Sequence, residues 1–430
     1  MSQPSGPGAI APMGQSPVPH GRLPQWPVLR KKQVFVVPII AIAVGALVMG
    51  LLIALQVITA PTQALFGLFI SALAAIVGIL LLTWLDRWEP EPPHLLISAF
   101  FWGGGVSLLF LVFAYPVAQA VGGDGAFFTA AIAAPLLEES AKGLFLVIVM
   151  LTTRRGRAEF NSLTDAVVYA GFIGIGFTFI EDIGYIAGQT TVGEAIGVAA
   201  LRIGLGAWLH SIFTAMTAIG LWLGVTSRGP LRFLYPFFGW CVAVLLHAIH
   251  NGSSFFGIGA FFAAILLVML PATIAIIVLA VRSHRREGEI FRGQLPAMVY
   301  NGWVTPQEAN WLTNLRSRRL ALSHAKTQGK HERARVAAFR DHVTELAYVR
   351  NRLDRMGPPF AQELVHQHDD LVRLIEADKQ WVAEHLQPVP QGWHEVPPTP
   401  GQDYLPESFD LQPPPPGGPP PIDPDATRIR

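Results

Sequence analysis

The chain has 430 residues, of which 51% are hydrophobic and only 14% are charged, whereas soluble domains carry about 25% charged residues. Its formal net charge of +1 does not favour a nucleic-acid partner or an acidic substrate. The single cysteine, Cys241, excludes an internal disulfide framework and a zinc-finger spacing, and we interpret it as a small buried apolar residue. Charged residues are sparse up to about position 281 and abundant afterwards, which indicates a membrane region followed by a soluble tail.

The first predicted element is a membrane helix that begins near Val34, directly after the basic run Arg30–Lys32. Its apolar stretch extends to about Ile58, well beyond the roughly 7–15 residues of a signal-peptide core, so we expect an uncleaved first span. Seven further stretches have the length needed to cross about 30 Å of hydrocarbon. The eight predicted spans are 34–58, 63–85, 95–120, 127–151, 163–188, 198–225, 233–252 and 256–281.

Basic residues in the connecting loops predict the orientation of these spans. With eight spans, every basic cluster falls on one side of the membrane. The opposite loops, near Pro61, Gly122–Gly125 and Gln189–Gly193, contain no lysine or arginine. The sequence therefore predicts a multi-pass protein of the cell membrane with both termini in the cytoplasm. The basic residues on the cytoplasmic side are Arg30, Lys31, Lys32, Arg87, Arg154, Arg155, Arg157, Arg228, Arg232, Arg282, Arg285 and Arg286.

The predicted fold class is all-α: a polytopic membrane bundle of about eight transmembrane helices, a cytoplasmic helical tail and disordered Pro-rich termini. The termini, 1–32 and 388–430, are too rich in proline and glycine to build a packed core. Between them we expect a transmembrane domain, 33–282, and a charged cytoplasmic region, 283–387, whose pattern favours amphipathic helices. We interpret the proline segments as tethers, with a ligand for a proline-reading domain as the alternative, and the tail as a surface for a cytoplasmic partner.

Ionisable side chains inside four spans need an explanation, because each costs at least about 2.5–3.5 kcal/mol at the bilayer centre. The fourth span contains Glu138, Glu139 and Lys142. Glu138 and Lys142 are four residues apart and can pair on one helical face. The two adjacent carboxylates point in different directions, so one suits a general base in a wet cavity and the other suits orienting a partner. The structural alternative is an interhelical ion pair that stabilises the bundle.

The fifth span carries two more acids, Glu181 and Asp182, one or two turns after three glycines. Small residues let neighbouring helix backbones approach closely in a membrane. Asp165 lies near the start of the same span, either as a helix-start residue or as a functional acid. The three glycines are Gly171, Gly174 and Gly176.

Histidines occur in the next two spans, His210 in the sixth and His247 in the seventh, with Asn251 one turn after His247. A lone histidine in a span is usually a satisfied polar contact. Two histidines combined with two acidic pairs instead favour a ligand set, because catalytic zinc prefers neutral imidazole and carboxylate ligands with one position open for water.

Depth in the membrane supports one site. From the helical rise, Glu181 and His247 lie about 8–10 Å below the outer surface, and Glu138 and His210 about 15–18 Å below it. All four therefore occupy the outer half of the membrane, where Lys142 is the one basic residue that we expect among them. We predict that they line a water-accessible cavity that opens outward.

These motifs, in order and each on its own span, resemble the PrsW family of intramembrane proteases, relatives of the type II CAAX prenyl proteases. The resemblance covers roughly residues 63–282 and includes the loop Asp86–Pro92 and the segment Asp165–Gly171. The motifs that carry it are Glu138-Glu139-x-x-Lys142, Phe177-x-x-x-Glu181, His210 and His247-x-x-x-Asn251.

The resemblance implies an endopeptidase that cuts a single-span or membrane-anchored protein, in some members a regulatory factor such as an anti-sigma factor. Glu138 or Glu139 would activate water, and Asn251 would bind metal or stabilise the oxyanion. A zinc ion is the expected cofactor, with a metal-free glutamate mechanism as the alternative. The catalytic candidates are Glu138, Glu139, Lys142 and Asn251. The candidate metal ligands are Glu181, His210 and His247.

Two positions depart from the pattern. Asp182 stands where the family often has asparagine, which adds a candidate acid. His250 is an extra candidate ligand, but it points about 100° away from His247, which favours a neighbour over a participant. The alternative functions are an ion- or proton-coupled transporter and an inactive membrane scaffold. The sequence shows no inverted repeat or pair of broken helices, which many transporters have.

Overall fold

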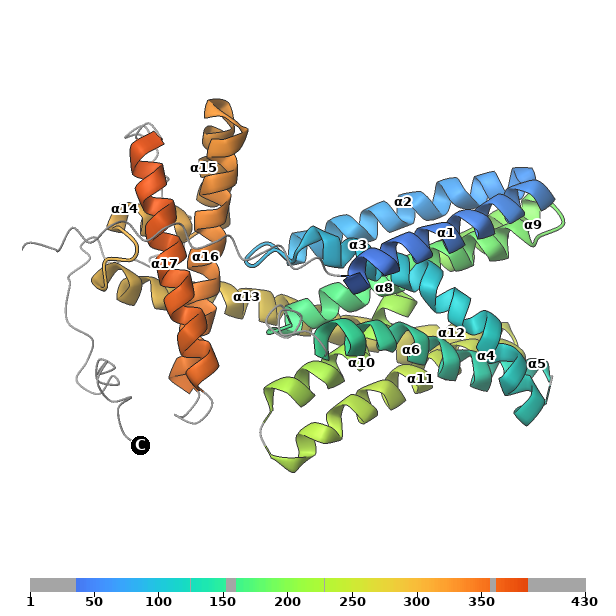
Figure 1. Cartoon of the computed structure of the whole chain (residues 1–430). Coiled ribbons are helices and arrows are strands. Elements are labelled where there is room, and N and C mark those ends of the chain that lie inside the picture. Colours follow the sequence, from blue (N-terminus) through green and yellow to red (C-terminus); the bar gives the residue numbers. More distant parts are fainter. Residues whose placement is uncertain (1–35, 124, 152–159, 228, 356–360, 386–430) are drawn as a thin grey trace, which may run out of the picture.

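A computed structural model describes residues 36–123, 125–151, 160–227, 229–355 and 361–385. These residues form helices and connecting turns with no strand among them, which confirms the all-α prediction (Figure 1). The proline-rich termini 1–32 and 388–430 lie outside the described residues, as do several of the basic residues used to orient the spans. Those basic residues are Arg30, Lys31, Lys32, Arg154, Arg155, Arg157 and Arg228.

Each predicted span corresponds to a helical rod. Within the described ranges, six rods are long and apolar enough to cross a membrane, judged by length and composition. They are Val36–Thr59 (α1), Pro61–Leu85 (α2), Pro93–Gly122 (α3 Pro93–Phe101, η1 Trp102–Val106, α4 Ser107–Gly122), Leu163–Ala187 (α8), Val192–Thr226 (α9 Val192–Leu201, η4 Arg202–Gly206, α10 Leu209–Thr226) and Ile258–Tyr300 (α12 Ile258–Ala264, η7 Ile265–Met269, α13 Leu270–Tyr300).

The other two predicted spans are also helical, but polar residues interrupt their apolar character. The fourth carries two glutamates and a lysine, and the seventh carries two histidines and an asparagine near its end. The helices are α5 Ala126–Phe128, η2 Thr129–Ala133, α6 Ala134–Phe145 and η3 Leu146–Leu151 for the fourth span, and α11 Tyr235–Ser253 for the seventh. Cys241 on α11 is half-buried, so the prediction of a buried cysteine is wrong.

Helix α8 is the centre of the membrane bundle, and most of its residues are buried. It packs against α2, α3 and α10 (Figure 1). A Cβ at Gly174 would overlap the backbone of Ser211 on α10, and one at Gly176 would overlap the carbonyl of Phe100 on α3. The prediction that glycines on this span permit close helix packing is therefore confirmed. This close packing places the end of α8 that carries Glu181 against the start of α10, where His210 lies.

Asp165 begins α8 as a capping residue. The Ser162 side chain accepts a hydrogen bond from the Asp165 backbone nitrogen at 3.1 Å, and Asp165 Oδ2 accepts one from the Ser162 backbone nitrogen at 2.7 Å. Such a capping box satisfies backbone donors that the first helical turn leaves unpaired. The helix-start interpretation of Asp165 is therefore confirmed. The same helix holds the 86–92 loop, because Tyr169 donates a 2.5 Å hydrogen bond to Glu91.

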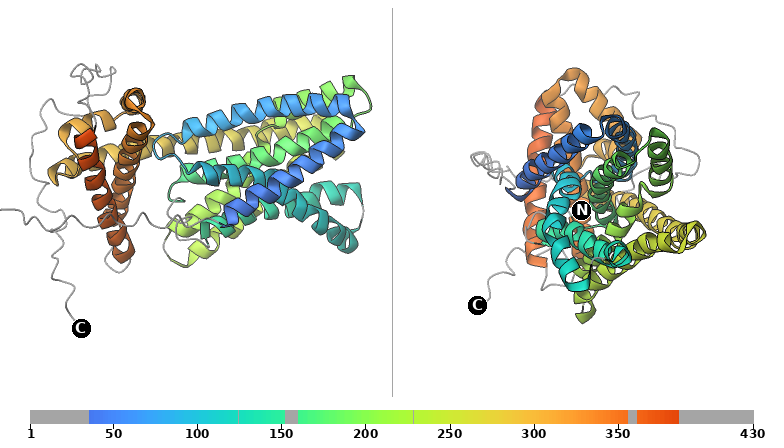
Figure 2. Two further views of the ribbon diagram at one scale, coloured as in Figure 1. Left: turned by 45° about the horizontal axis from the view of Figure 1, so that its top comes forward. Right: turned by 90° about the vertical axis from the view of Figure 1, so that its right-hand side faces the viewer.

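The tail is helical where the structure describes it and lies at one end of the bundle. Figure 2 shows its helices running crosswise to the long axis of the membrane helices. Helix α13 continues from the bundle into the tail. The tail helices are α14 Pro306–Leu312, α15 Leu315–Gln328, α16 Lys330–Arg355 and α17 Ala361–His385.

A second hydrophobic core joins the tail to the 86–92 loop. Trp88 of this loop is buried beside Phe291 of α13 and the apolar faces of the tail helices. Arg318 of α15 donates hydrogen bonds to the carbonyls of Leu312 and Trp88 at 2.8 and 3.2 Å, and its guanidinium lies 4.9 Å from the Trp88 ring centroid. Burial lowers the pKa of Arg318 to about 9. This contact places the C-terminal end of α2 and the C-terminal part of α13 at the same end of the bundle. The predicted topology has an even number of spans between these two points, so it also places them on the same side of the membrane.

Candidate active site

Four helices bring the predicted ionisable residues into one buried cluster, which we call the Glu/His cluster. Helix α6 contributes three of them, and α8, α10 and α11 contribute one each. The cluster consists of Glu138, Glu139, Lys142, Glu181, His210 and His247. Residues separated by more than 100 positions in the sequence thus meet within hydrogen-bonding distance.

Lys142 lies at the centre of this cluster and has no exposed surface. Its Nζ donates to Glu139 Oε1 at 2.7 Å and to His210 Nδ1 at 2.8 Å. The predicted pair with Glu138 is present at 3.8 Å, so Lys142 lies closer to Glu139, three residues away, than to Glu138. Nζ also lies 3.9 Å from the centroid of the Phe177 ring, a cation–π contact that further stabilises a desolvated ammonium.

The hydrogen-bond partners define the tautomer of each histidine. An ammonium has only donors, so His210 Nδ1 accepts from Lys142 and its Nε2–H donates to Glu181 Oε2 at 2.8 Å. His247 Nδ1 lies 3.1 Å from Glu139 Oε1 and donates to this carboxylate. The Nε2 lone pair of His247 then faces Glu138 Oε2, 3.8 Å away. In metal sites, a histidine ligand is commonly oriented by a carboxylate that accepts a hydrogen bond from its other ring nitrogen.

The two adjacent glutamates differ in their surroundings. Glu139 is fully buried and accepts hydrogen bonds from Lys142, His247 and, at 3.3 Å, the Thr214 hydroxyl. Glu138 Oε1 accepts a hydrogen bond from the Tyr115 hydroxyl at 2.9 Å, whereas its Oε2 is buried with no hydrogen-bond partner among the described residues. Glu138 is therefore the carboxylate that is left available for another group.

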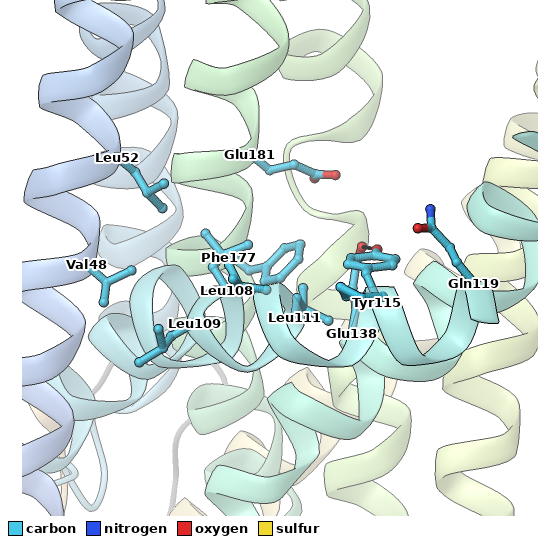
Figure 3. A pocket seen from close by; sticks show the side chains of 12 residues that line it. Val48, Leu52, Leu108, Leu109, Leu111, Tyr115, Gln119, Glu138, Phe177 and Glu181 are labelled. Atoms are coloured by element: carbon cyan, nitrogen blue, oxygen red, sulfur yellow. Dashed lines mark hydrogen bonds between the residues drawn. The ribbon is translucent and has the colours of Figure 1, made fainter. Parts of the chain in front are cut away.

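A cavity of about 460 Å³ adjoins Glu138 and Glu181, and we call it the apolar groove (Figure 3). Its walls are mainly aliphatic and aromatic side chains of α1, α4 and α8, such as Leu52, Leu111 and Phe177. Glu138 and Glu181 are both among the side chains that line it (Figure 3), so the groove reaches the Glu/His cluster. The structure thus provides a cavity beside the acids, with walls that are more apolar than the predicted wet cavity.

The prediction that Lys142 is the one basic residue among these acids is wrong. Arg202, in η4, lies 2.6 Å from Glu181 Oε2 through Nη2 and 2.5 Å from Asp182 Oδ1 through Nε. An arginine within a predicted span is itself a signal, because a charge there needs a partner. The rod that carries it begins at Val192 and is broken by a turn at Ala207 and Trp208. This break lets η4 lie beside the end of α8.

Asn251 and His250 lie next to the cluster. The Asn251 amide nitrogen donates to the Ala130 carbonyl at 3.0 Å, which joins α11 to the helical rod that carries Glu138. His250 packs against the rings of Phe213 and Phe261, at centroid distances of 6.2 and 5.6 Å. His250 is thus a neighbour of the cluster, as its direction on the helix predicts.

Three residues could hold a metal ion. One ligand atom from each of Glu138, His210 and His247 lies within 4.8 Å of the other two. Two imidazoles and a carboxylate are a donor set that suits zinc, and the unpartnered Glu138 Oε2 fits the role of a ligand. The sequence predicts Glu181 as the carboxylate ligand, but in the structure Glu181 pairs with Arg202 and His210.

Comparison with known proteins finds one family that this chain resembles. Residues 91–279 match the family model described as PrsW family intramembrane metalloprotease. Protease PrsW of Bacillus subtilis (strain 168) is 26% identical over 190 residues, which cover 44% of this chain and 82% of that protein. Protease PrsW of Oceanobacillus iheyensis is 26% identical over 227 residues, or 51% of this chain and 95% of that protein. No solved structure matches the chain. Residues 91–279 of this chain are therefore similar to the PrsW family of intramembrane metalloproteases.

Proposed function

We propose that this protein is an intramembrane endopeptidase that hydrolyses a peptide bond of a membrane-anchored protein at the Glu/His cluster. One observation carries the proposal. Glu138 Oε2 is buried and unpartnered among the described residues, lies 3.8 Å from His247 Nε2, and belongs to a residue that borders the apolar groove. A substrate segment in the groove would bring its carbonyl next to this carboxylate oxygen, which has free acceptor capacity.

Each residue of the Glu/His cluster would have a separate role in such a reaction. Glu138 would take a proton from the attacking water, because general-base catalysis needs a free carboxylate oxygen within reach of that water. Glu139 would orient His247, and Lys142 would hold His210 in a single tautomer. Of the two amide hydrogens of Asn251, one bonds to Ala130, and the other would be available to stabilise the oxyanion.

In a metal-dependent reaction, Glu138, His210 and His247 would hold a zinc ion, and Glu138 would then act as a ligand instead of the base. Such an ion supplies polarisation of the scissile carbonyl and acidification of a bound water. Binding through His210 Nε2 requires that nitrogen to give up its bond to Glu181. In a metal-free reaction, Glu138 would deprotonate water directly, and His247 would polarise the carbonyl once its Nε2 also carries a proton.

The apolar groove and the similarity to the PrsW family support the proposed substrate class. An apolar groove suits a membrane-anchored chain, for example a regulatory protein such as an anti-sigma factor. The protease names of both relatives count against the transporter alternative. We further propose that both termini face the cytoplasm. A reporter fused after Arg286 should then report the cytoplasm, and an external signal at that position would overturn the eight-span orientation.

The test of function uses purified full-length protein, candidate membrane-anchored substrates and four variants: Glu138→Gln, Glu181→Gln, His210→Ala and His247→Ala. We expect the wild type to cleave and each variant to lose most of its activity. The exposed Glu289→Gln and His331→Ala are matched controls that should cleave as the wild type does. Cleavage that survives in all four variants would rule out this site.

Element analysis of the same preparations decides the metal question. About one equivalent of zinc in the wild type, lost in both histidine variants, would support the metal-dependent reaction. Full activity without bound metal, and with Glu138→Gln inactive, would support the glutamate reaction.

A further inference from the structure

Tyr115 is absent from the predicted site residues, yet it directly contacts Glu138. Its hydroxyl donates a 2.9 Å hydrogen bond to Glu138 Oε1. Tyr115 belongs to α4, whereas Glu138 belongs to α6. Figure 3 shows the Tyr115 ring beside the Glu138 carboxylate, at the edge of the apolar groove. The contact therefore joins a wall of the groove to the acid that we assign as the base.

This hydrogen bond makes the two oxygens of Glu138 different from each other. Rotation about the last side-chain bond of a glutamate is broad and could present either oxygen. With Oε1 held by the tyrosine, Oε2 is left buried and unpartnered among the described residues. It lies 3.8 Å from both His247 Nε2 and Lys142 Nζ. The free oxygen is thus the one that faces the histidine.

The phenol suits this role because it donates a hydrogen bond without adding charge. A lysine or arginine at the same position would form an ion pair with Glu138 and compete with a water proton for the carboxylate. The tyrosine is half-buried, and the neighbouring Pro116 cannot donate a backbone hydrogen bond within α4. The Tyr115 side chain therefore comes from a turn whose backbone hydrogen bonding is weakened, next to the groove.

We propose that Tyr115 is a positioning residue of the hydrolysis, a proposal that rests on the proposed function. It holds the Glu138 carboxylate so that Oε2 faces His247 and the water to be activated. It also borders the groove, so an apolar substrate segment lying there contacts the tyrosine ring while its scissile carbonyl meets Glu138.

The test compares Tyr115→Phe with the wild type in the full-length protein reconstituted with a cleaved membrane substrate. Phenylalanine keeps the ring that borders the groove and removes only the hydroxyl. We expect kcat to fall on the order of 10–100-fold, the size typical of losing a group that orients an active-site ligand. KM should change less than about threefold, because the groove wall remains. The exposed Tyr300→Phe is the matched control and should leave both constants unchanged.

An infrared measurement separates positioning from mere helix packing. The carboxyl bands that disappear in Glu138→Gln report the bonding of this group, and they should shift in Tyr115→Phe while the thermal unfolding midpoint stays within about 2 °C. Unshifted bands, an unchanged kcat, or a fall in kcat explained by lower thermal stability would each overturn the proposal.

The outcomes for Tyr115 and for the proposed function are distinguishable. If the wild type cleaves, Glu138→Gln does not and Tyr115→Phe matches the wild type, the protease assignment stands and the role of Tyr115 is rejected. If the wild type cleaves none of the membrane-anchored substrates, both proposals fail together.

Discussion

Lys142 Nζ lies 2.8 Å from His210 Nδ1, and both side chains are buried. The ammonium lies between this imidazole and Glu139 and therefore determines which nitrogen of His210 carries the proton. A lysine ammonium can donate to a histidine only when the imidazole is neutral, because a protonated imidazole has no acceptor nitrogen and the two cations repel each other. The contact is stable here because Glu139 neutralises the lysine at 2.7 Å.

Replacing Lys142 by methionine should therefore remove both the activity and much of the stability. The apolar stem is kept, but Glu139 becomes a buried charge without its main partner, and such a loss costs about 3–5 kcal/mol. Substrate cleavage and thermal unfolding in detergent measure the two effects. Lys326→Met on α15 is exposed and should change neither. A stable and active Lys142→Met would show that His210 needs no cation beside it.

Arg202 should be required for the orientation of Glu181. Arg202→Met removes the group that contacts both Glu181 and Asp182, and Glu181 in turn contacts His210. We therefore expect cleavage to fall on the order of 10–100-fold, the size typical of losing a group that orients an active-site ligand. Arg202→Lys should rescue little, because one ammonium cannot reproduce the planar two-nitrogen contact.

Asp182→Asn is the matched test of the second acid that Arg202 contacts. Its amide oxygen can still accept the hydrogen bond from Arg202 Nε, so activity should remain within a few-fold of the wild type. Kinetic assays with both variants check these expectations. If Asp182→Asn loses as much activity as Arg202→Met, Asp182 has a direct role in the reaction.

Gly174→Ala should destabilise the bundle, because the new methyl group would meet the backbone of Ser211. Overpacking of this kind costs typically about 1–3 kcal/mol, and it would also move His210 on the same helix as Ser211. Thermal unfolding and cleavage should both decrease. Gly50→Ala on α1, where the added methyl group has no heavy atom within 4 Å, is the control and should leave both unchanged. An equal effect of the two substitutions would contradict the close-packing argument.

Trp88→Ala should detach the tail from the membrane region. The Trp88 side chain is 6% exposed and contributes to the core of the tail, and loss of a buried tryptophan costs about 3–5 kcal/mol. Limited proteolysis should then cut the connection between α13 and α14 faster. Trp84→Ala, at a side chain that is 50% exposed, should have a smaller effect. Unchanged proteolysis of Trp88→Ala would show that α13 alone holds the tail in place.

Much of the site could be predicted because charge within a membrane is costly and therefore rarely accidental. Glu138, Glu181, His210 and His247 lie together as the depth argument predicts, each on its own helix. The sequence analysis does not predict Arg202 at the site, because Arg202 lies within a largely apolar stretch, although the same energetic argument applies to it.

The sequence by itself determines the all-α class, the apolar segments and the polar residues that they carry, since these depend on local hydrophobicity over about 20 residues. Only the tertiary structure decides which oxygen of Glu138 is free, which glutamate holds Lys142 and that Tyr115 joins the site. These contacts depend on how far each helix is rotated and how closely it approaches its neighbours. Rotation and approach are set by packing between segments far apart in the chain, such as Gly174 against Ser211, and no local pattern records them.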